Sequence, residues 1–303
     1  MRGAEVIRLQ KLLNIVADGI FGPATEKAVM RYQLSKQLTV DGIVGNNTWQ
    51  MLTISKGDNE AIDEDTDITN QYFNTNFNQQ IHRYYLDEKQ YLNKPGKNEY
   101  CFLHHTAGRE DPYKVIDHWN RDSRGRVATE FVIGGQSHKN GDDSYDGIVV
   151  QAFPESGYGW HLGKTGSGYM NRHSIGIEIC SAGYLKLDPA SNVYKTYFNS
   201  SVIDSQSIKL ESPFRKRIAW HKYSDKQMEE VGKLLEHIQE RDGIDMRLGL
   251  RQWIKQDGPV KAFGFQEDAY RGKVKGLITH TNVRRDKSDC YPDERLIDII
   301  LSL

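Results

Sequence analysis

The fold is decided by the stretch Tyr100-Cys101-Phe102-Leu103-His104-His105-Thr106-Ala107-Gly108. A short apolar run that ends in a small polar turn predicts a buried strand. Two histidines stand where this strand ends, so a rigid element holds them at the mouth of a crevice, as a metal ligand or a proton shuttle requires. A histidine pair alone more often reflects packing than chemistry, so its meaning depends on partners elsewhere in the chain.

The bulk composition excludes several classes of protein. The 303 residues carry a formal net charge of −1, so no strong field favours nucleic acid or an anionic membrane. No apolar run approaches the length of a membrane span, and residues 1–6 lead into a helical pattern without the apolar segment of a signal peptide. Three widely separated cysteines argue against a disulfide framework. We therefore expect a monomer that is synthesised in the cytoplasm, with no nucleic-acid or membrane partner.

The first fifty residues contain an internal repeat. The segments 18–22 (Asp-Gly-Ile-Phe-Gly) and 41–45 (Asp-Gly-Ile-Val-Gly) are tight glycine turns, and residues typical of a helix start follow each one. Apolar residues at helical spacing precede, separate and follow the turns. The sequence therefore predicts a small three-helix domain over residues 1–54.

The rest of the chain changes character twice. Residues 55–75 are polar and acidic with few apolar side chains, which predicts a solvated linker. Over residues 76–303 strand-like and helix-like segments alternate, which predicts an α/β domain with a mixed central β-sheet flanked by helices. Strands are predicted at 129–133, 148–153, 174–180 and 276–279, and helices at 111–121, from 224 onward and at 294–303.

A second histidine offers a partner for the first pair. The last predicted strand ends at His280, and the loop after it contains both Asp289 and Cys290. Two histidines, one from each strand exit, with one anionic ligand would leave the fourth position of a tetrahedral zinc open to water, which is the catalytic pattern. Water bound there becomes a usable nucleophile near neutral pH.

Such a site also needs a general base. Glu178 interrupts an otherwise apolar strand, and alternation places its side chain opposite to those of Ile177 and Ile179. If it is buried near a metal, Glu178 is a candidate general acid or base. The alternative for this residue alone is a salt-bridged strand position.

These motifs resemble two known families. About the first 53 residues resemble the type 1 peptidoglycan-binding domain in both glycine turns and in Leu9-Gln10, Tyr32-Gln33 and Thr48-Trp49. Residues 97–295, apart from a long insertion, resemble type 2 N-acetylmuramoyl-L-alanine amidases, which include phage lysozyme-amidases and animal peptidoglycan recognition proteins. The second resemblance is carried by residues 102–107, 159–163, 174–178, 279–280 and 287–289.

The amidase resemblance implies a zinc amidase fold and a set of roles. It implies that His104 and His280 are zinc ligands, that Glu178 is the catalytic acid and base, and that Lys287 stabilises the developing oxyanion. It places His161 and Trp160 at the substrate. His105 matches no ligand position, so we expect it to support the substrate site or to be structural.

Two features depart from the family pattern. The third ligand follows the lysine by two residues, which selects Asp289, whereas the affinity of thiolate for zinc would select Cys290; we favour Asp289. The stretch 183–221 is longer than the fold needs and rich in aromatic residues, so it is either a substrate wall or a surface excursion, and the sequence does not decide.

The expected function is hydrolysis of bacterial peptidoglycan at the amide between N-acetylmuramic acid and L-alanine. Without a signal segment, the pairing of a wall-binding domain with a wall hydrolase favours a phage or prophage endolysin that reaches the wall after release from the host cytoplasm. Two alternatives remain at this stage, namely a glycan-cleaving wall hydrolase and a non-catalytic peptidoglycan-binding protein.

Overall fold

The structure is a computed structural model of the chain. It describes residues 2–52 except 14, 16, 37, 39–41, 46, 47 and 50, together with residues 77–163 and 166–303. The chain divides into two compact units, residues 1–78 and 79–303. The linker predicted for residues 55–75 lies outside the described residues, as does Asp41 of the second glycine turn.

The N-terminal unit is helical, as predicted. Helix α1 spans Ala4–Leu12 and α2 spans Pro23–Ser35, and the described residues between 48 and 52 are helical as well. Leu9, Val29 and Leu52 form the buried centre of this unit. One apolar residue thus comes from each of the three segments that the sequence pattern singled out.

The internal repeat builds the same polar anchor twice. In each copy a glutamine accepts a hydrogen bond from the N–H of the turn glycine and donates to the next carbonyl and to a threonine hydroxyl. The partners lie 2.8–3.1 Å away and are Gly19, Ile20 and Thr25 for Gln10, and Gly42, Ile43 and Thr48 for Gln33. Each glycine turn is therefore fastened to the helix that precedes it.

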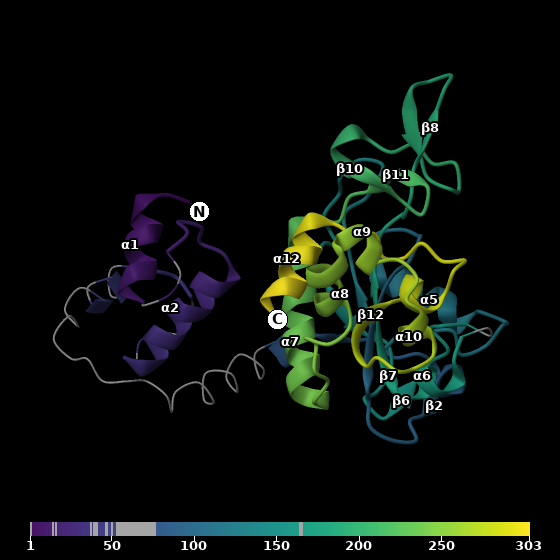
Figure 1. The fold of residues 1–303 in the computed structure, drawn as a ribbon, viewed down its shortest axis with the longest axis horizontal. Helices are drawn as coiled ribbons and strands as arrows, with labels where there is room; N and C mark the ends of the chain where they lie inside the picture. The colour runs from purple at the N-terminus through teal and green to yellow at the C-terminus, as the bar shows by residue number, and fades with distance from the viewer. Residues whose placement is uncertain are drawn as a thin grey trace. The chain divides into compact units, whose positions relative to one another are not determined.

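A six-stranded sheet forms the centre of the second unit (Figure 1). Its order is β1–β5–β4–β7–β3–β12, and only the β4–β5 pair is antiparallel. The strands are His82–Arg83 (β1), Val149–Gln151 (β5), Phe131–Ile133 (β4), Ser174–Ile179 (β7), Tyr100–His105 (β3) and Gly276–Thr279 (β12). The predicted mixed sheet is confirmed, with strands at all the predicted positions.

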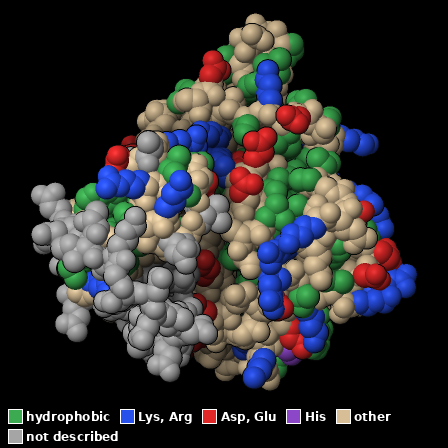
Figure 2. All heavy atoms as spheres, turned by 60° about the vertical axis from the view of Figure 1, so that its left-hand side comes forward, with side chains coloured by type: hydrophobic (Ala, Val, Ile, Leu, Met, Phe, Trp, Pro, Cys, Tyr) green, Lys and Arg blue, Asp and Glu red, His purple; other side chains and the backbone are tan. Residues whose placement is uncertain are grey.

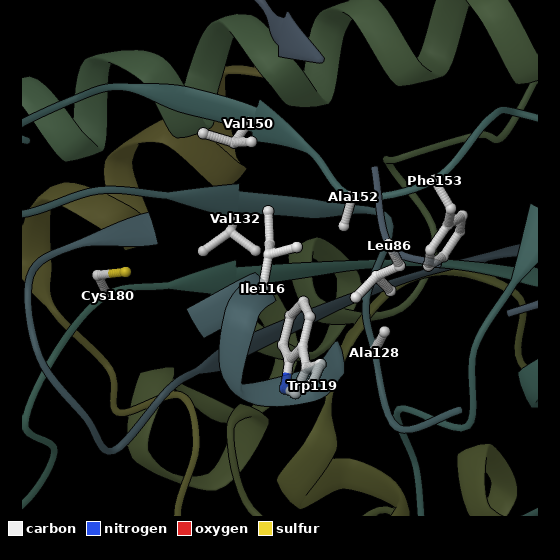
Figure 3. Packing of buried hydrophobic residues seen from close by; sticks show 9 residues of the cluster. All are labelled: Leu86, Ile116, Trp119, Ala128, Val132, Val150, Ala152, Phe153 and Cys180. Carbon is white, nitrogen blue, oxygen red and sulfur yellow. The ribbon is translucent and has the colours of Figure 1, made fainter. Parts of the chain in front are cut away.

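Helices cover both faces of the sheet. The strand register sends His104, Glu178 and Val132 to one face, because they are neighbours across β3, β7 and β4. Helix α5 (Pro112–Asn120) covers that face, and Figure 3 shows its Ile116 and Trp119 packed towards Val132. The opposite face packs against α7 (Asp225–Asp242), which in turn contacts α12 (Glu294–Ser302).

Local sequence explains where the long helices start and stop. Asp111 caps α5 by accepting from the N–H groups of Tyr113 and Lys114. Ser224 opens α7 with the predicted capping box, and Gly243 ends it in the left-handed conformation at φ 69°. The shorter helices are α6 (Gly168–Arg172), α8 (Leu250–Asp257), α9 (Pro259–Ala262), α10 (Glu267–Tyr270) and α11 (His280–Val283).

Residues 183–221, here called the insertion arm, form two antiparallel hairpins. The first pairs β8 (Lys186–Asp188) with β9 (Val193–Lys195), and the second pairs β10 (Ser207–Phe214) with β11 (Arg217–His221). The arm projects from one end of the sheet (Figure 1). A further short pair joins β2 (Leu92–Asn93) to β6 (Gly157–Tyr158).

No described helix combines the length and the apolar character needed to span a lipid bilayer. Figure 2 shows acidic and basic side chains interspersed over the visible face, in keeping with the formal net charge of −1.

Candidate active site

Three ligand-type side chains converge where β3 and β12 end. His104 Nδ1 lies 3.1 Å from His280 Nδ1, and Asp289 Oδ2 lies 3.3 Å from the first nitrogen and 3.0 Å from the second. All three side chains are buried. Among the described residues this is the one group of histidine, cysteine, aspartate and glutamate side chains arranged closely enough to hold a metal ion.

The charge state of this group suits a cation. Burial opposes the ionisation of Asp289, but the two neighbouring histidines outweigh it and hold the pKa of the carboxyl well below its ordinary value. Burial lowers the pKa of His104 to about 4. At neutral pH His104 is therefore a neutral imidazole with a free lone pair beside a carboxylate anion, which is the protonation state that metal binding requires.

The backbone around His280 differs from the prediction. The strand predicted at 276–279 is confirmed as β12, but His280, which was predicted to lead into a loop, begins α11. The turn forms because the side chain of Asn282 accepts from both the N–H of Thr279, at 2.8 Å, and its hydroxyl, at 2.9 Å. The ligand-type histidine therefore sits on a capped helical turn.

Cys290 turns away from the group. Its buried thiol interacts with the side chain of Tyr223, and burial raises its pKa well above the ordinary value, so it stays protonated. The structure thus brings Asp289, and not Cys290, to the two histidines.

His161 approaches the group from behind His104. His161 Nδ1 lies 2.9 Å from His104 Nε2, and its own Nε2 lies 2.7 Å from the hydroxyl of Ser174, the first residue of β7. When His104 Nδ1 offers its lone pair to a metal, His104 Nε2 carries the proton and donates it to His161 Nδ1. His161 then donates through Nε2 to Ser174, so one chain of hydrogen bonds fixes both tautomers.

The other two residues expected near the substrate lie in different settings. Trp160 is half-buried and lines a large pocket together with His161 and Lys287. His105 faces the other side of the sheet, where Nδ1 lies 3.0 Å from the hydroxyl of Tyr223, and burial lowers its pKa to about 4. Trp160 is therefore accessible to a ligand. His105 is instead buried against Tyr223 on the opposite face of the sheet from His104.

Glu178 is the direct neighbour of His104 across β3 and β7. One carboxylate oxygen, Oε2, is buried and has no hydrogen-bond partner among the described residues. Burial raises the pKa of Glu178 well above its ordinary value, with a further contribution from Asp289 and an opposing one from Lys287. A carboxyl group poised this way can exchange a proton with a bound molecule.

Two pockets are lined by residues that were predicted to act at this site. The Trp160 pocket has a volume of about 1000 Å³ and also contains Lys287. The Glu178 pocket has a volume of about 340 Å³ and is lined by the loop after β3, by α5 and by Tyr197 of the insertion arm. The two share no lining residue; Lys287 lines the first and Glu178 the second.

The insertion arm also braces the site. Arg215, at its β10–β11 turn, donates to the carbonyl oxygens of Thr281 at 3.0 Å, Arg284 at 3.3 Å and Arg285 at 3.2 Å. These carbonyls belong to α11 and to the loop that leads to Asp289. One guanidinium therefore fixes the course of the chain between two ligand-type residues.

Two residues with a place in this arrangement were not predicted from the sequence, namely Ser174 and Arg215, whereas Tyr197 belongs to the aromatic stretch that was predicted as a possible substrate wall. Ser174 opens a strand that was recognised, but nothing in the sequence shows that its hydroxyl faces His161. Tyr197 and Arg215 lie in the insertion, whose contacts depend on how its hairpins fold back.

A sequence model of the N-acetylmuramoyl-L-alanine amidase family matches residues 94–290, about two thirds of the chain. The chain belongs to this family. A second model, described as a putative peptidoglycan binding domain, matches residues 2–52. The amidase match includes His104, His280 and Asp289, here called the metal-type group. It also includes Glu178, Lys287 and His161.

The solved structures that this chain matches include amidases and endolysins. The selenomethionine derivative of AmpD is 14% identical, with 73% of this chain and 94% of AmpD covered at a TM-score of 0.39. The structure of PlyL is 12% identical, with 69% of this chain and 85% of PlyL covered at a TM-score of 0.37. A mutant endolysin from Bacillus subtilis is 27% identical, with 33% of this chain and 60% of the endolysin covered at a TM-score of 0.25. The family assignment rests on the sequence match over residues 94–290.

Proposed function

We propose that the protein is a zinc-dependent peptidoglycan amidase that hydrolyses the amide between N-acetylmuramic acid and the L-alanine of the stem peptide. The observation that carries this proposal is the convergence of His104, His280 and Asp289 next to the buried carboxyl group of Glu178, in a chain of the amidase family.

The geometry of the three donor atoms fits zinc. Tetrahedral zinc with ligand distances of about 2.0–2.1 Å places neighbouring ligand atoms about 3.3 Å apart. The three separations here are 3.0, 3.1 and 3.3 Å. His104 Nδ1, His280 Nδ1 and Asp289 Oδ2 would hold the ion. When bound, zinc supplies Lewis acidity that polarises a carbonyl group and acidifies water.

Glu178 and Lys287 would carry the remaining chemistry. Glu178 takes a proton from the attacking water, whose oxygen adds to the lactyl carbonyl carbon. As the carbon–nitrogen bond breaks, Glu178 returns that proton to the leaving amino group of L-alanine. The raised pKa of Glu178 suits this exchange. The ammonium group of Lys287 provides positive charge for the oxygen of the same carbonyl.

The N-terminal unit would hold the enzyme on its insoluble substrate. Its match to a peptidoglycan binding domain supports this role, because a tethered hydrolase works at a raised effective concentration of cleavable bonds. We infer that the protein acts as a phage or prophage endolysin. Cells that express it should then lyse only after their membrane is permeabilised; lysis during expression without permeabilisation would contradict this role.

Metal content and product analysis test the enzymatic proposal directly. The purified protein should contain one zinc per chain, and it should release new amino groups from purified cell walls without new reducing ends. Removing the metal with a chelator should stop the release, and added zinc should restore it. New reducing ends alone would identify a glycan-cleaving hydrolase, whereas a zinc-free protein that leaves the walls turbid would identify a binding protein.

A further inference from the structure

The residues that directly follow two of the ligand-type side chains meet at one tyrosine. His105 follows His104 at the end of β3, and Cys290 follows Asp289 in the loop before α12. Both side chains are buried, and neither takes part in the chemistry proposed above. Tyr223, which directly precedes the capping residue of α7, is fully buried and contacts both of them.

The contact with each partner is made by the hydroxyl group of Tyr223. The hydroxyl lies 3.0 Å from His105 Nδ1, and it also forms a hydrogen bond with the thiol of Cys290. A phenolic hydroxyl can serve both partners because it donates one hydrogen bond and accepts another. Burial raises the pKa of Tyr223 well above its ordinary value, so the hydroxyl keeps its proton.

Tyr223 is itself held in place through its ring and its backbone. The ring stacks on that of Tyr291, with centroids 4.5 Å apart and planes inclined by 15°. Its N–H donates to the hydroxyl of Tyr291 at 3.2 Å, and its carbonyl oxygen accepts from Arg295 Nη2 at 2.8 Å. The hydroxyl is therefore a fixed point to which other segments are attached.

Backbone contacts tie together two of the three pairs of ligand-bearing segments. The pairing of β3 with β12 brings the ends of both strands side by side, and with them His104 and His280. The N–H of Thr281 donates to the carbonyl oxygen of Asp289 at 3.2 Å, which ties the loop to α11. The third pair, the loop with Asp289 and the strand with His104, is joined through Tyr223.

We propose that Tyr223 is a positioning residue for the zinc site, an inference that rests on the proposed function. Its hydroxyl ties the loop that carries Asp289 to the strand that carries His104 before the metal binds. The tie runs through Cys290 on one side and through His105 on the other. Without it the loop would also adopt conformations that cannot bind zinc, and the apparent affinity would fall with the fraction of molecules in which the three donors are together.

Removing the hydroxyl alone tests the tie. Tyr223→Phe keeps the stacked ring, and its zinc affinity, measured by competition with a chromophoric chelator, should be about three- to tenfold lower than that of the wild type. Tyr100→Phe is the matched control, because Tyr100 is buried at the opposite end of β3 and its hydroxyl donates to the carbonyl oxygen of Gly272 at 3.3 Å. This control should lower the unfolding temperature of the metal-free protein without changing the zinc affinity.

The two partners of the hydroxyl supply a readout that a general loss of stability would not produce. Cys290→Ala should weaken zinc binding, and Cys290→Ser, which keeps a hydrogen-bonding group, should recover most of the affinity. Because Tyr223→Phe and Cys290→Ala break the same tie, the double variant should bind zinc no more weakly than Tyr223→Phe alone. His105→Asn, which keeps a polar atom where Nδ1 stands, should bind zinc more tightly than His105→Leu.

The outcomes separate this inference from the proposed function. A wild-type protein that binds zinc, with Tyr223→Phe binding it equally tightly, overturns the positioning role and leaves the amidase assignment standing. A double variant in which the two losses of binding free energy simply add also overturns the role, since the two residues would then act independently. A wild-type protein that binds no zinc overturns both.

Discussion

The hydrogen-bond chain behind His104 leads to a prediction about metal affinity. In the metal-free protein His104 can adopt either tautomer, because its Nδ1 can donate to Asp289, which lies 3.3 Å away. Metal binding at Nδ1 forces the proton onto Nε2. In His161→Ala that buried N–H loses its partner at 2.9 Å, and an unpaired buried donor costs about 1–3 kcal/mol. Since the cost arises only in the metal-bound state, zinc affinity should fall by about 10–100-fold.

Two isosteric variants separate the hydrogen bond from the volume of the ring. His161→Asn places an oxygen where Nδ1 stands and keeps an acceptor for His104, whereas His161→Gln reaches Ser174 instead. Zinc affinity, measured by competition with a chromophoric chelator, should follow the order wild type, Asn, then Gln and Ala together. Thermal unfolding of the metal-free variants controls for folding. If the alanine variant binds zinc as tightly as the wild type, the tautomer argument fails.

Three further results are expected. Glu178→Gln should keep zinc, and its kcat should be about 10²–10⁴-fold lower than that of the wild type. Retained turnover in a hydrolysis assay would remove Glu178 from the mechanism. Asp289→Ala should lose zinc by elemental analysis while Cys290→Ser keeps it, and the opposite pattern would reverse the choice of third ligand. Burial lowers the pKa of His221 to about 3 from 6.5. Below pH 6.5 this histidine is therefore protonated in the unfolded state but stays neutral in the folded state. The resulting loss of stability is about 2 kcal/mol at pH 5. His221→Asn keeps the bond from the N–H of Ala182, at 3.0 Å, so urea unfolding at pH 7 and pH 5 should show a smaller difference; an unchanged difference would exclude His221 as its source.

The sequence predicted the features that depend on local pattern. The apolar run at 100–105 and the interrupted run at 174–179 are confirmed as β3 and β7, because full burial of a strand demands apolar residues along its length. Pairing these strands in register then places Glu178 beside His104. The family assignment and the mixed sheet were likewise predicted, since they follow from several motifs at once.

What the sequence could not predict depends on contacts between distant segments. The choice between Asp289 and Cys290 needed the backbone course that turns one side chain to the histidines and buries the other against Tyr223. The chain from His104 through His161 to Ser174 joins residues up to 70 positions apart. Neither periodicity nor turn chemistry carries information about such pairs.

The bonds from Arg215 have a consequence for protein engineering. The insertion arm resembles an appendage that could be trimmed to make a smaller enzyme, yet its guanidinium is bonded to three carbonyl groups beside the ligand-type residues. A truncated variant would keep every residue of the metal-type group while losing the support for the segment between two of them. Shortening the arm while retaining the β10–β11 turn is therefore the safer route to a minimal catalytic domain.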